Sequence, residues 1–299
     1  MVSIQAHIIN RYLAKTMKTL PLAQMEPEKI REVFDSAKTF PLPKDVFTYP
    51  VAAPVKGEWH CPPAVRPEDD TPRTVLYFHG GGYVFGSPKT HRPMTFALAR
   101  GLNVPVFSLD YRLAPEHPCP AAVDDAEAAF EYLLSCGKRA GDIVVGGDSA
   151  GGGLTLALIQ RLRDKGRDLP GRVFLFSPWT DLTASGDSID ANEPTDFMFM
   201  AASVRDGAPR YGGILSLQNS EVSPLFGSFA DLPPMLVFAS SSECLFDDSV
   251  RMVDKARKAG VEVEFIEKPG LVHVWPLFTP VMPEANAALR RTLAFIRAD

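Results

Sequence analysis

A glycine-flanked serine lies near the middle of the chain, between a strand-like and a helix-like stretch. Residues 143–154 read IVVGGDSAGGGL and contain GDSAG, which fits the pattern G-x-S-x-G. The β-branched residues before it favour a short buried strand, and the apolar spacing after it favours a helix. A strand, a tight turn and a helix form the setting of a nucleophile elbow, so the pattern predicts a nucleophilic Ser149. The alternative is a glycine-rich turn with an incidental serine, because short patterns also arise by chance.

A second glycine cluster follows an earlier strand-like segment. Residues 73–78 predict a buried strand, and the run His79-Gly80-Gly81-Gly82 comes directly after it. Successive glycines let backbone amides approach a ligand closely, and such amides can stabilise the oxyanion of a tetrahedral intermediate. A phosphate loop and a flexible turn are the alternatives. The sequence contains no G-x-x-x-x-G-K-[ST], and neither glycine cluster fits G-x-G-x-x-G.

A serine hydroxyl needs a general base, normally a histidine that a carboxylate orients. Where G-x-S-x-G carries the nucleophile, the order along the chain is serine, acid, histidine. Of the six histidines, only His273 follows Ser149, and it lies in a loop after the strand expected at 261–266. The order therefore predicts His273 as the base, against the alternative of a solvated loop histidine.

The acid is expected just beyond the strand at 235–239, where the sequence reads SSSECLFDDSV. Glu243 is the first carboxylate of this stretch. Asp247 and Asp248 adjoin the helix expected at 248–259, where an aspartate commonly caps the first turn. Glu243 is therefore the preferred acid, and Asp247 is the alternative.

The elements that must position these residues alternate between strand and helix. Further strands are expected at 46–51, 57–61, 104–109 and 172–176, and further helices at 121–134 and 283–297. This alternation predicts an α/β fold with a mostly parallel sheet flanked by helices. After 104–109 the run YRLAPEHP predicts a kinked loop, in which Arg112 and Glu116 could pair.

Two segments lie outside this alternation. Residues 1–45 predict two helices that could cover part of the sheet or simply pack on the core, and 182–227 predicts an insertion over the sheet. The core would then comprise 46–181 and 228–299. The first helix has Ile4, Ile8 and Tyr12 on one face; the second begins at Pro27 and has a stripe of Ile30, Val33, Phe34 and Ala37.

Four apolar residues in the insertion could line an acyl pocket, because methionine adapts to irregular apolar shapes. The alternative is that they form the ordinary core of the insertion. These residues are Phe197, Met198, Phe199 and Met200.

Composition narrows the class of protein further. The chain has 299 residues, of which 45% are hydrophobic and 22% charged, as in a globular enzyme. Its net charge of −5, without a run of five like charges, argues against a nucleic-acid surface. The four cysteines are scattered without a CxxC pair, so we expect neither a metal site nor a disulfide framework. We see no signal peptide and no membrane span, and we expect a cytoplasmic protein.

The HGGG run, GDSAG, YRLAPEHP and the late histidine occur together and in a fixed order. Over nearly its whole length the chain resembles the hormone-sensitive-lipase-like branch of the α/β-hydrolase fold, the bacterial family IV carboxylesterases. The resemblance implies an eight-stranded, mostly parallel sheet with a helical cap. It also implies an oxyanion hole made by the amides of Gly81, Gly82 and Ala150.

The chain departs from this family at two positions. The family often has Asp-Pro-Leu-x-Asp where this chain has Glu243 and the four residues after it, so Glu243 takes the place of the catalytic aspartate. The base is often followed by glycine and phenylalanine, and here Val274 and Trp275 follow His273. The second departure would reshape the floor of the pocket without removing the base.

The resemblance implies that the chain hydrolyses carboxylic esters through an acyl-enzyme. Since a cap limits the pocket, we expect short- to medium-chain acyl esters of small molecules as substrates. The serine mechanism needs no metal or organic cofactor, and we expect none. The family often forms homodimers through the last sheet edge, here 261–266. An amidase or peptidase with the same triad remains an alternative. The second alternative is a non-catalytic binding protein, like the plant gibberellin receptors. Those receptors lack the catalytic histidine, which is present here as His273.

Overall fold

A single eight-stranded sheet organises the chain. The computed structural model describes residues 2–36 and 42–298. The strand order is β1-β2-β4-β3-β5-β6-β7-β8; β2 is antiparallel to both of its neighbours, and every pair from β4 to β8 is parallel. The predicted fold class, an α/β protein with a mostly parallel sheet, is therefore confirmed. The strands are β1 (Phe47–Val51), β2 (Gly57–Cys61), β3 (Thr74–Phe78), β4 (Val106–Leu109), β5 (Ile143–Asp148), β6 (Arg172–Phe176), β7 (Met235–Ser240) and β8 (Val263–Lys268).

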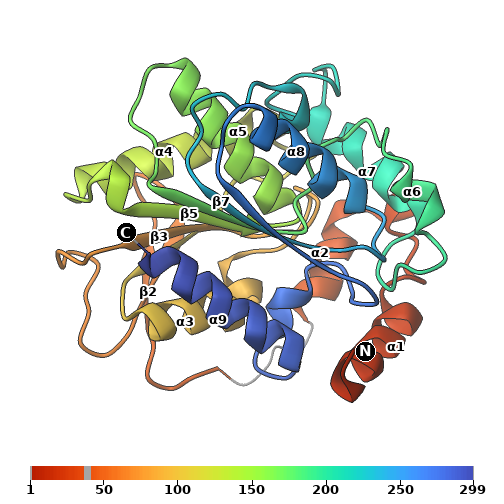
Figure 1. Ribbon diagram of the computed structural model, residues 1–299, viewed down its shortest axis with the longest axis horizontal. Coiled ribbons are helices and arrows are strands. Elements are labelled where there is room, and N and C mark those ends of the chain that lie inside the picture. Colours follow the sequence, from red (N-terminus) through yellow and green to blue (C-terminus); the bar gives the residue numbers. More distant parts are fainter. Residues whose placement is uncertain (1, 37–41, 299) are drawn as a thin grey trace.

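Helices cover both faces of the sheet (Figure 1). The helices α3 (Pro88–Leu102) and α9 (Pro283–Arg297) lie on one face, and α4 (Ala121–Ser135), α5 (Ala150–Asp164) and α8 (Phe246–Lys258) lie on the other. In β3, Leu76 and Phe78 belong to the core on the side of α4 and α5, whereas Val75 and Tyr77 belong to the core on the side of α3. This alternation buries the central strands on both faces, as is typical of parallel sheets.

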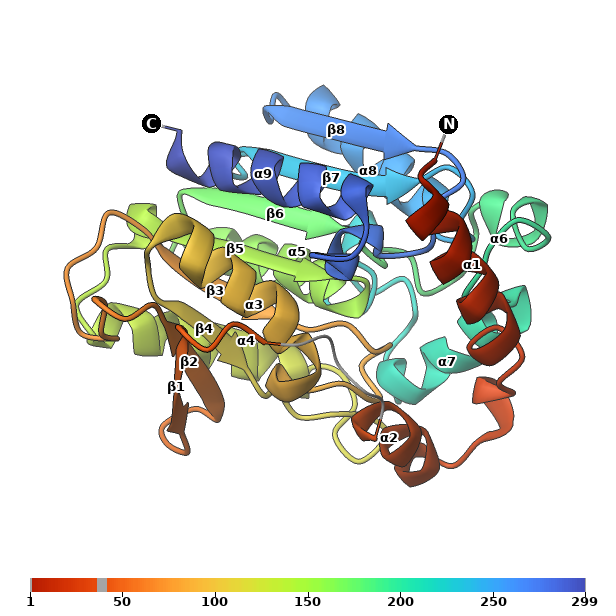
Figure 2. The same cartoon turned by 90° about the horizontal axis from the view of Figure 1, so that it is seen from below.

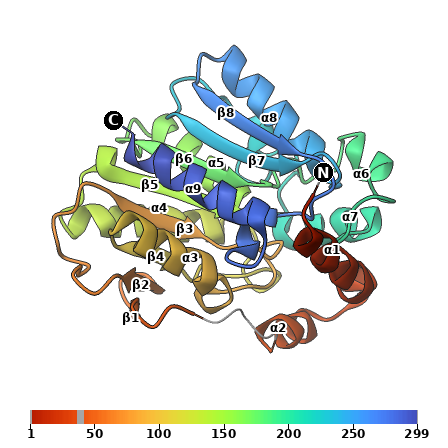
Figure 3. The ribbon, with the colours of Figure 1, turned by 60° about the horizontal axis from the view of Figure 1, so that its bottom comes forward.

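The remaining helices gather at the end of the sheet where the parallel strands finish (Figures 2 and 3). They are α1 (Ile4–Thr16), α2 (Pro27–Asp35), α6 (Ser188–Ala191) and α7 (Ala201–Gly212). The last two lie within 182–227, so this segment does interrupt the alternation, while the division into cap and core remains a prediction. Single-turn helices are η1 (Leu22–Gln24), η2 (Ala140–Asp142), η3 (Pro224–Phe226) and η4 (Trp275–Phe278).

Helix α1 packs on the rest of the chain through one face only. Ala6 and Asn10 are buried, and the Asn10 amide donates to Gly270 O at 2.8 Å. The predicted apolar face points outward instead, since Ile4, Ile8 and Tyr12 are all exposed. No helix among the described residues is long and apolar enough to cross a membrane. Ala37, which we assigned to the stripe of the second helix, lies outside the described residues.

The expected pair of Arg112 and Glu116 is wrong. Arg112 instead forms a two-pronged ion pair with Asp125 of α4, at 2.7 Å, and its own amide donates to the same carboxylate. Glu116 pairs with Arg31 of α2 at 2.7 Å. Several hydrogen bonds from Arg112 to one carboxylate are stronger together than the single ion pair with Glu116 that we expected. The ion pair of Glu116 thus connects this loop to helix α2.

Several element boundaries differ from the prediction by one or two residues; strand β4, for example, begins at Val106 rather than at 104. Strand β8 begins at Val263 rather than at 261, and α8 begins at Phe246 rather than at 248. Asp247 and Asp248 therefore occupy the first turn of α8, and the residue that caps this helix, Leu245, makes no side-chain capping bond. Both side chains remain near the N-terminus of the helix, as expected for residues of its first turn.

Candidate active site

Ser149 occupies a strained turn between β5 and α5. Its backbone has φ 52° and ψ −120°, a left-handed conformation that a residue with a side chain rarely adopts. The turn leaves no room for side chains beside it: a Cβ atom at Gly147 would lie 2.5 Å from Gly151 O, and one at Gly151 would lie 2.1 Å from Phe78 O. The small residues of GDSAG are therefore required by the close approach of the backbone, and they present Ser149 at the end of the sheet.

The second glycine cluster lies beside this turn. Gly81 and Gly82 have φ of 119° and 59°, and both line the same cavity as Ser149. Within residues 2–36 and 42–298, no protein acceptor takes the amide hydrogens of Gly81, Gly82 or Ala150. Ala150 is the first residue of α5, where the helix leaves backbone N–H groups without partners. The three amides are thus free to donate to a ligand oxygen.

His273 and Glu243 form a buried pair. The Nδ1 atom of His273 lies 2.7 Å from Glu243 Oε2, and the exposed fractions of the two side chains are 1% and 0%. Glu243 Oε1 accepts from the amide of Ser240 at 3.1 Å, which fixes the carboxylate. The Nε2 atom of His273 is buried without a hydrogen-bond partner among the described residues. With Nδ1 bonded to the carboxylate, Nε2 is the nitrogen that can accept a proton.

The charge around His273 favours its protonated form. Burial of the ring opposes protonation, but the Glu243 carboxylate outweighs it, with smaller effects from Asp196 and Asp148, and the pKa of His273 is raised. An imidazole with a raised pKa is a stronger base when it is neutral, which suits proton abstraction from a hydroxyl.

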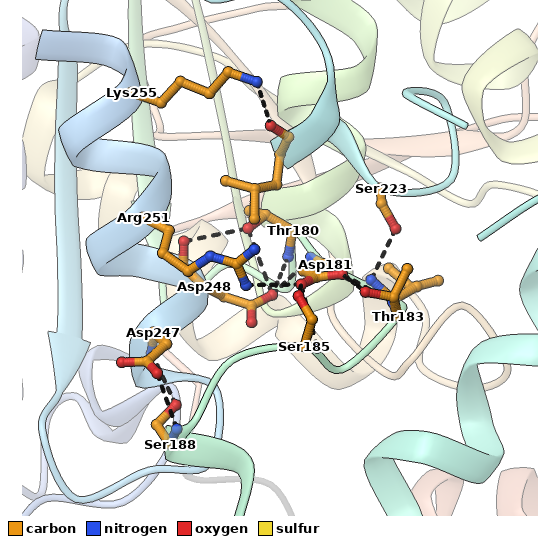
Figure 4. A network of polar contacts seen from close by, with 12 residues as sticks. Thr180, Asp181, Thr183, Ser185, Ser188, Ser223, Asp247, Asp248, Arg251 and Lys255 are labelled. Atoms are coloured by element: carbon orange, nitrogen blue, oxygen red, sulfur yellow. Dashed lines mark hydrogen bonds and ion pairs between the residues drawn. The ribbon is translucent and has the colours of Figure 1, made fainter. Parts of the chain in front are cut away.

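Asp247 and Asp248 bond to other partners, as Figure 4 shows. Asp247 Oδ2 accepts from the amide of Ser188 at 2.9 Å. Asp248 Oδ2 accepts from the amides of Thr180 and Asp181, both at 2.7 Å. Of the two candidate acids, the structure therefore brings Glu243, and not Asp247, against His273.

An apolar cavity of about 340 Å³ lies beside Ser149 and His273. Ser149 and His273 line it together with residues from α2, the glycine cluster and α7. Of the four apolar residues proposed from the sequence, Met198 and Phe199 line the cavity. The Phe199 ring meets the His273 ring edge-on, with centroids 5.0 Å apart. Phe197 and Met200 are not among the residues that line the cavity, and Phe197 packs instead against the core on the side of α3.

A buried polar cluster beneath Ser149 had no signal in the sequence patterns. Asp148 accepts a hydrogen bond from the Tyr77 hydroxyl at 2.6 Å, and its other oxygen lies 3.4 Å from Nε2 of His91. Burial of Asp148 opposes its ionisation, but His91 and Tyr77 outweigh this and lower its pKa. Burial lowers the pKa of His79 to about 3, so this ring is neutral, and its Nδ1 donates to Gly80 O at 2.8 Å. The cluster fixes the residue that precedes Ser149.

No metal centre emerges from the described residues, which contain no group of three or more histidine, cysteine, aspartate or glutamate side chains that could hold an ion. The free cysteines Cys61, Cys119 and Cys244 are buried, and burial raises the pKa of the Cys119 thiol to about 11. These three thiols are therefore neutral at pH 7, and none of them is among the residues that line the cavity.

Comparisons with known proteins relate the chain to hydrolases and esterases of one fold. Residues 75–277 match a family described by its α/β-hydrolase fold. An acetyl-hydrolase of Streptomyces hygroscopicus is 41% identical over 241 residues, which cover 81% of this chain and 79% of that protein. A crystal structure of EstE5 soaked with p-nitrophenyl butyrate has a TM-score of 0.91 at 33% identity, covering 99% of this chain and 98% of that one. An esterase from the bacterial hormone-sensitive lipase family has a TM-score of 0.89 at 34% identity and the same coverage.

Proposed function

Because this chain belongs to the bacterial hormone-sensitive-lipase-like carboxylesterases of the α/β-hydrolase fold, we propose that it hydrolyses short- to medium-chain carboxylic esters through Ser149, His273 and Glu243. The observation that carries the proposal is the 2.7 Å contact between His273 Nδ1 and Glu243 Oε2 beside the cavity that Ser149 lines. A serine, a histidine and a buried carboxylate in this relationship are the parts of a nucleophile–base pair with its orienting acid.

The first half-reaction forms an acyl-enzyme. Ser149 Oγ attacks the carbonyl carbon as His273 Nε2 takes its proton, and the carbonyl oxygen becomes an oxyanion that the amides of Gly81, Gly82 and Ala150 stabilise. Glu243 holds the ring in the required tautomer and stabilises the imidazolium. The intermediate then collapses: the carbon–oxygen bond to the alcohol breaks, and His273 returns the proton to the leaving alkoxide.

The second half-reaction releases the acid. His273, neutral again, takes a proton from water as the water oxygen attacks the acyl-enzyme carbonyl, and the same amides stabilise the second oxyanion. The bond to Ser149 Oγ breaks, and the proton returns from His273 to the serine. No other reactant is needed.

The size and character of the cavity support small acyl groups. A volume of about 340 Å³ lies at the lower end of the range for ligand sites. Met198 and Phe199 bring apolar surface close to His273, which suits an aliphatic chain. The similarity to an acetyl-hydrolase and to EstE5, which was soaked with p-nitrophenyl butyrate, favours the same substrate class.

A matched substrate panel tests the proposal. We expect p-nitrophenyl acetate to hexanoate to be hydrolysed with a higher kcat/KM than the decanoate and palmitate, and the corresponding p-nitroanilides to react far more slowly. A faster reaction with anilides would favour the amidase alternative. Equal or faster turnover of palmitate would contradict the restriction to shorter chains.

We also propose that two copies pair through the edge strand β8, which is the last strand of the sheet. Its backbone groups on one side face no other strand of the described chain. An open edge of this kind can pair with a second copy. Light scattering after size-exclusion chromatography tests this directly, and a monomeric mass at all concentrations would contradict it.

A further inference from the structure

We propose that Asp196 is a positioning residue of the reaction, tying the wall of the cavity to the loop that carries Glu243. The inference rests on the proposed role of Glu243 and adds a residue that none of the sequence patterns indicated. Asp196 lies between β6 and β7 in the chain, just before α7, and its side chain is buried.

The loop that carries Glu243 is held by the segment at 188–196. We call residues 241–245 the acid loop. The side chain of Asn192 donates to the carbonyl oxygens of Ser241 and Glu243, at 3.1 and 3.0 Å. Ser188 Oγ donates to Cys244 O at 2.6 Å, and Thr195 Oγ1 donates to Ser242 O at 3.1 Å. The insertion thus supplies partners for most of the acid loop backbone, in addition to any role as a cover.

Asp196 makes the contact that reaches both sides. Its Oδ2 accepts from the amide of Cys244 at 2.7 Å, directly after Glu243 in the chain. Its Oδ1 accepts from the amides of Met198 and Phe199, at 2.7 and 2.9 Å. Met198 and Phe199 line the cavity, and Phe199 meets the His273 ring. A single carboxylate therefore fixes the cavity wall and the acid loop relative to each other.

The charge of Asp196 is also close to the reaction. Three backbone amides donate to the carboxylate, and such bonds to an ionised acceptor are stronger than those between neutral groups. The groups whose charge acts on His273 are Glu243, Asp196 and Asp148, and all three favour the imidazolium. Asp196 thus assists the ring that becomes positively charged as Ser149 attacks.

Asp196→Asn is the first variant. The amide has the same shape and can keep its oxygen towards Met198 and Phe199, but it then presents a donor to the Cys244 amide and carries no charge. We expect kcat for p-nitrophenyl butyrate to fall about 10- to 100-fold, because small displacements of a catalytic group have effects of this size. We also expect the acid limb of the kcat/KM profile to move to lower pH, since a negative charge near His273 is lost.

Asp196→Glu is the second variant and keeps the charge on a longer side chain. We expect a reduced kcat with the acid limb close to its wild-type position. This variant carries the test if Asp196→Asn does not fold. Asp190→Asn is the matched control, because Asp190 lies in the same segment but is exposed and, among the described residues, its side chain pairs only with Arg205, at 2.6 Å. We expect its kcat to stay within twofold of the wild type.

A double-mutant cycle with Glu243→Gln separates a positioning role from a general loss of stability. If Asp196 acts through Glu243, Asp196→Asn should lower kcat much less in the Glu243→Gln background than in the wild type. Equal fold-losses in both backgrounds, or kcat within twofold of the wild type for both Asp196 variants, would overturn the inference. Wild-type protein that hydrolyses none of the esters would instead refute the proposed function, so the two failures are distinguishable.

Discussion

Glu243 Oε2 lies 2.7 Å from Nδ1 of His273, and this pair is buried at the end of the sheet where β7 finishes. The contact determines which nitrogen of the ring can act, because it assigns Nδ1 to the carboxylate and leaves Nε2 without a hydrogen-bond partner in the part of the chain that the structure describes. It also distinguishes two neighbouring acids, since Asp247 bonds to Ser188 instead.

Replacing the two acids in matched variants should give unequal losses. Glu243→Gln keeps the shape of the side chain but allows the wrong tautomer of His273. We expect kcat/KM for p-nitrophenyl butyrate to fall by roughly two to four orders of magnitude, as for the acid of other serine triads. For Asp247→Asn we expect kcat/KM to stay within about fivefold of the wild type, which corresponds to the net energy of about one hydrogen bond. Steady-state kinetics of both proteins decide the matter, and the reverse ranking would move the acid to Asp247.

The pH profile should report the raised pKa of His273. The base must be neutral to accept a proton, so kcat/KM falls as pH drops through the pKa of the free enzyme. Although burial opposes protonation, Glu243 raises this pKa. We therefore expect the midpoint of the acid limb above the ordinary histidine value of about 6.5. A midpoint clearly below that value, measured with a neutral ester, would contradict the arrangement of charges around the ring.

Asp248 should make the stability of the fold depend on pH. Burial raises the pKa of Asp248 to about 7, even though the amides of Thr180 and Asp181 donate to it (Figure 4). Because the folded protein holds this proton more tightly than the unfolded chain, the contribution to stability is complete below about pH 4 and is lost as pH rises to about 7.

Asp248→Asn removes this titration and can keep the bonds to both amides. We expect the variant to gain stability relative to the wild type as pH rises: its free energy of unfolding minus that of the wild type should increase by about 2–3 kcal/mol between pH 5 and pH 8. Urea denaturation of both proteins at the two pH values measures the change. A constant difference between them would show that Asp248 keeps one protonation state over this range.

Phe199 and Phe197 offer a comparison within one short segment. Both rings pack against core clusters, but Phe199 also lines the cavity and contacts His273, whereas Phe197 does not line the cavity. Phe199→Ala shortens a side chain that lines the cavity and should leave room for a longer acyl chain. We expect the ratio of kcat/KM for p-nitrophenyl octanoate to that for p-nitrophenyl acetate to rise about tenfold, which corresponds to about 1.4 kcal/mol. Phe197→Ala should lower stability and leave the ratio unchanged. An equal change of this ratio in both variants would contradict the placement of Phe199 in the acyl site.

The patterns that could be predicted from the sequence are those that backbone geometry imposes. The glycines beside Ser149 are required because a Cβ at Gly147 or Gly151 would meet backbone oxygens. For the same reason, the strand, turn and helix around Ser149 follow from a few residues. The chain order of acid and base then narrows the search to His273 and two carboxylates.

Contacts between distant segments could not be predicted in the same way. Asp196 is 48 residues from the amide of Cys244, and no periodicity marks either residue. Arg112 has carboxylates both four and 13 positions away, and only the packing of α4 decides for Asp125. The outward face of α1 resembles a buried stripe in sequence, although Ile4 and Ile8 are exposed. In each case the partner is fixed by tertiary packing and not by local spacing.

The most direct test of the central claim is covalent labelling of Ser149 with a p-nitrophenyl phosphonate, read by mass spectrometry of the intact protein and of its peptides. The account predicts one adduct per chain, located on Ser149, with loss of esterase activity in proportion to labelling. Ser149→Ala should form no adduct and should lose roughly four to six orders of magnitude in kcat. An active wild-type protein that is labelled at another residue, or a Ser149→Ala variant that retains near-native turnover, would contradict it.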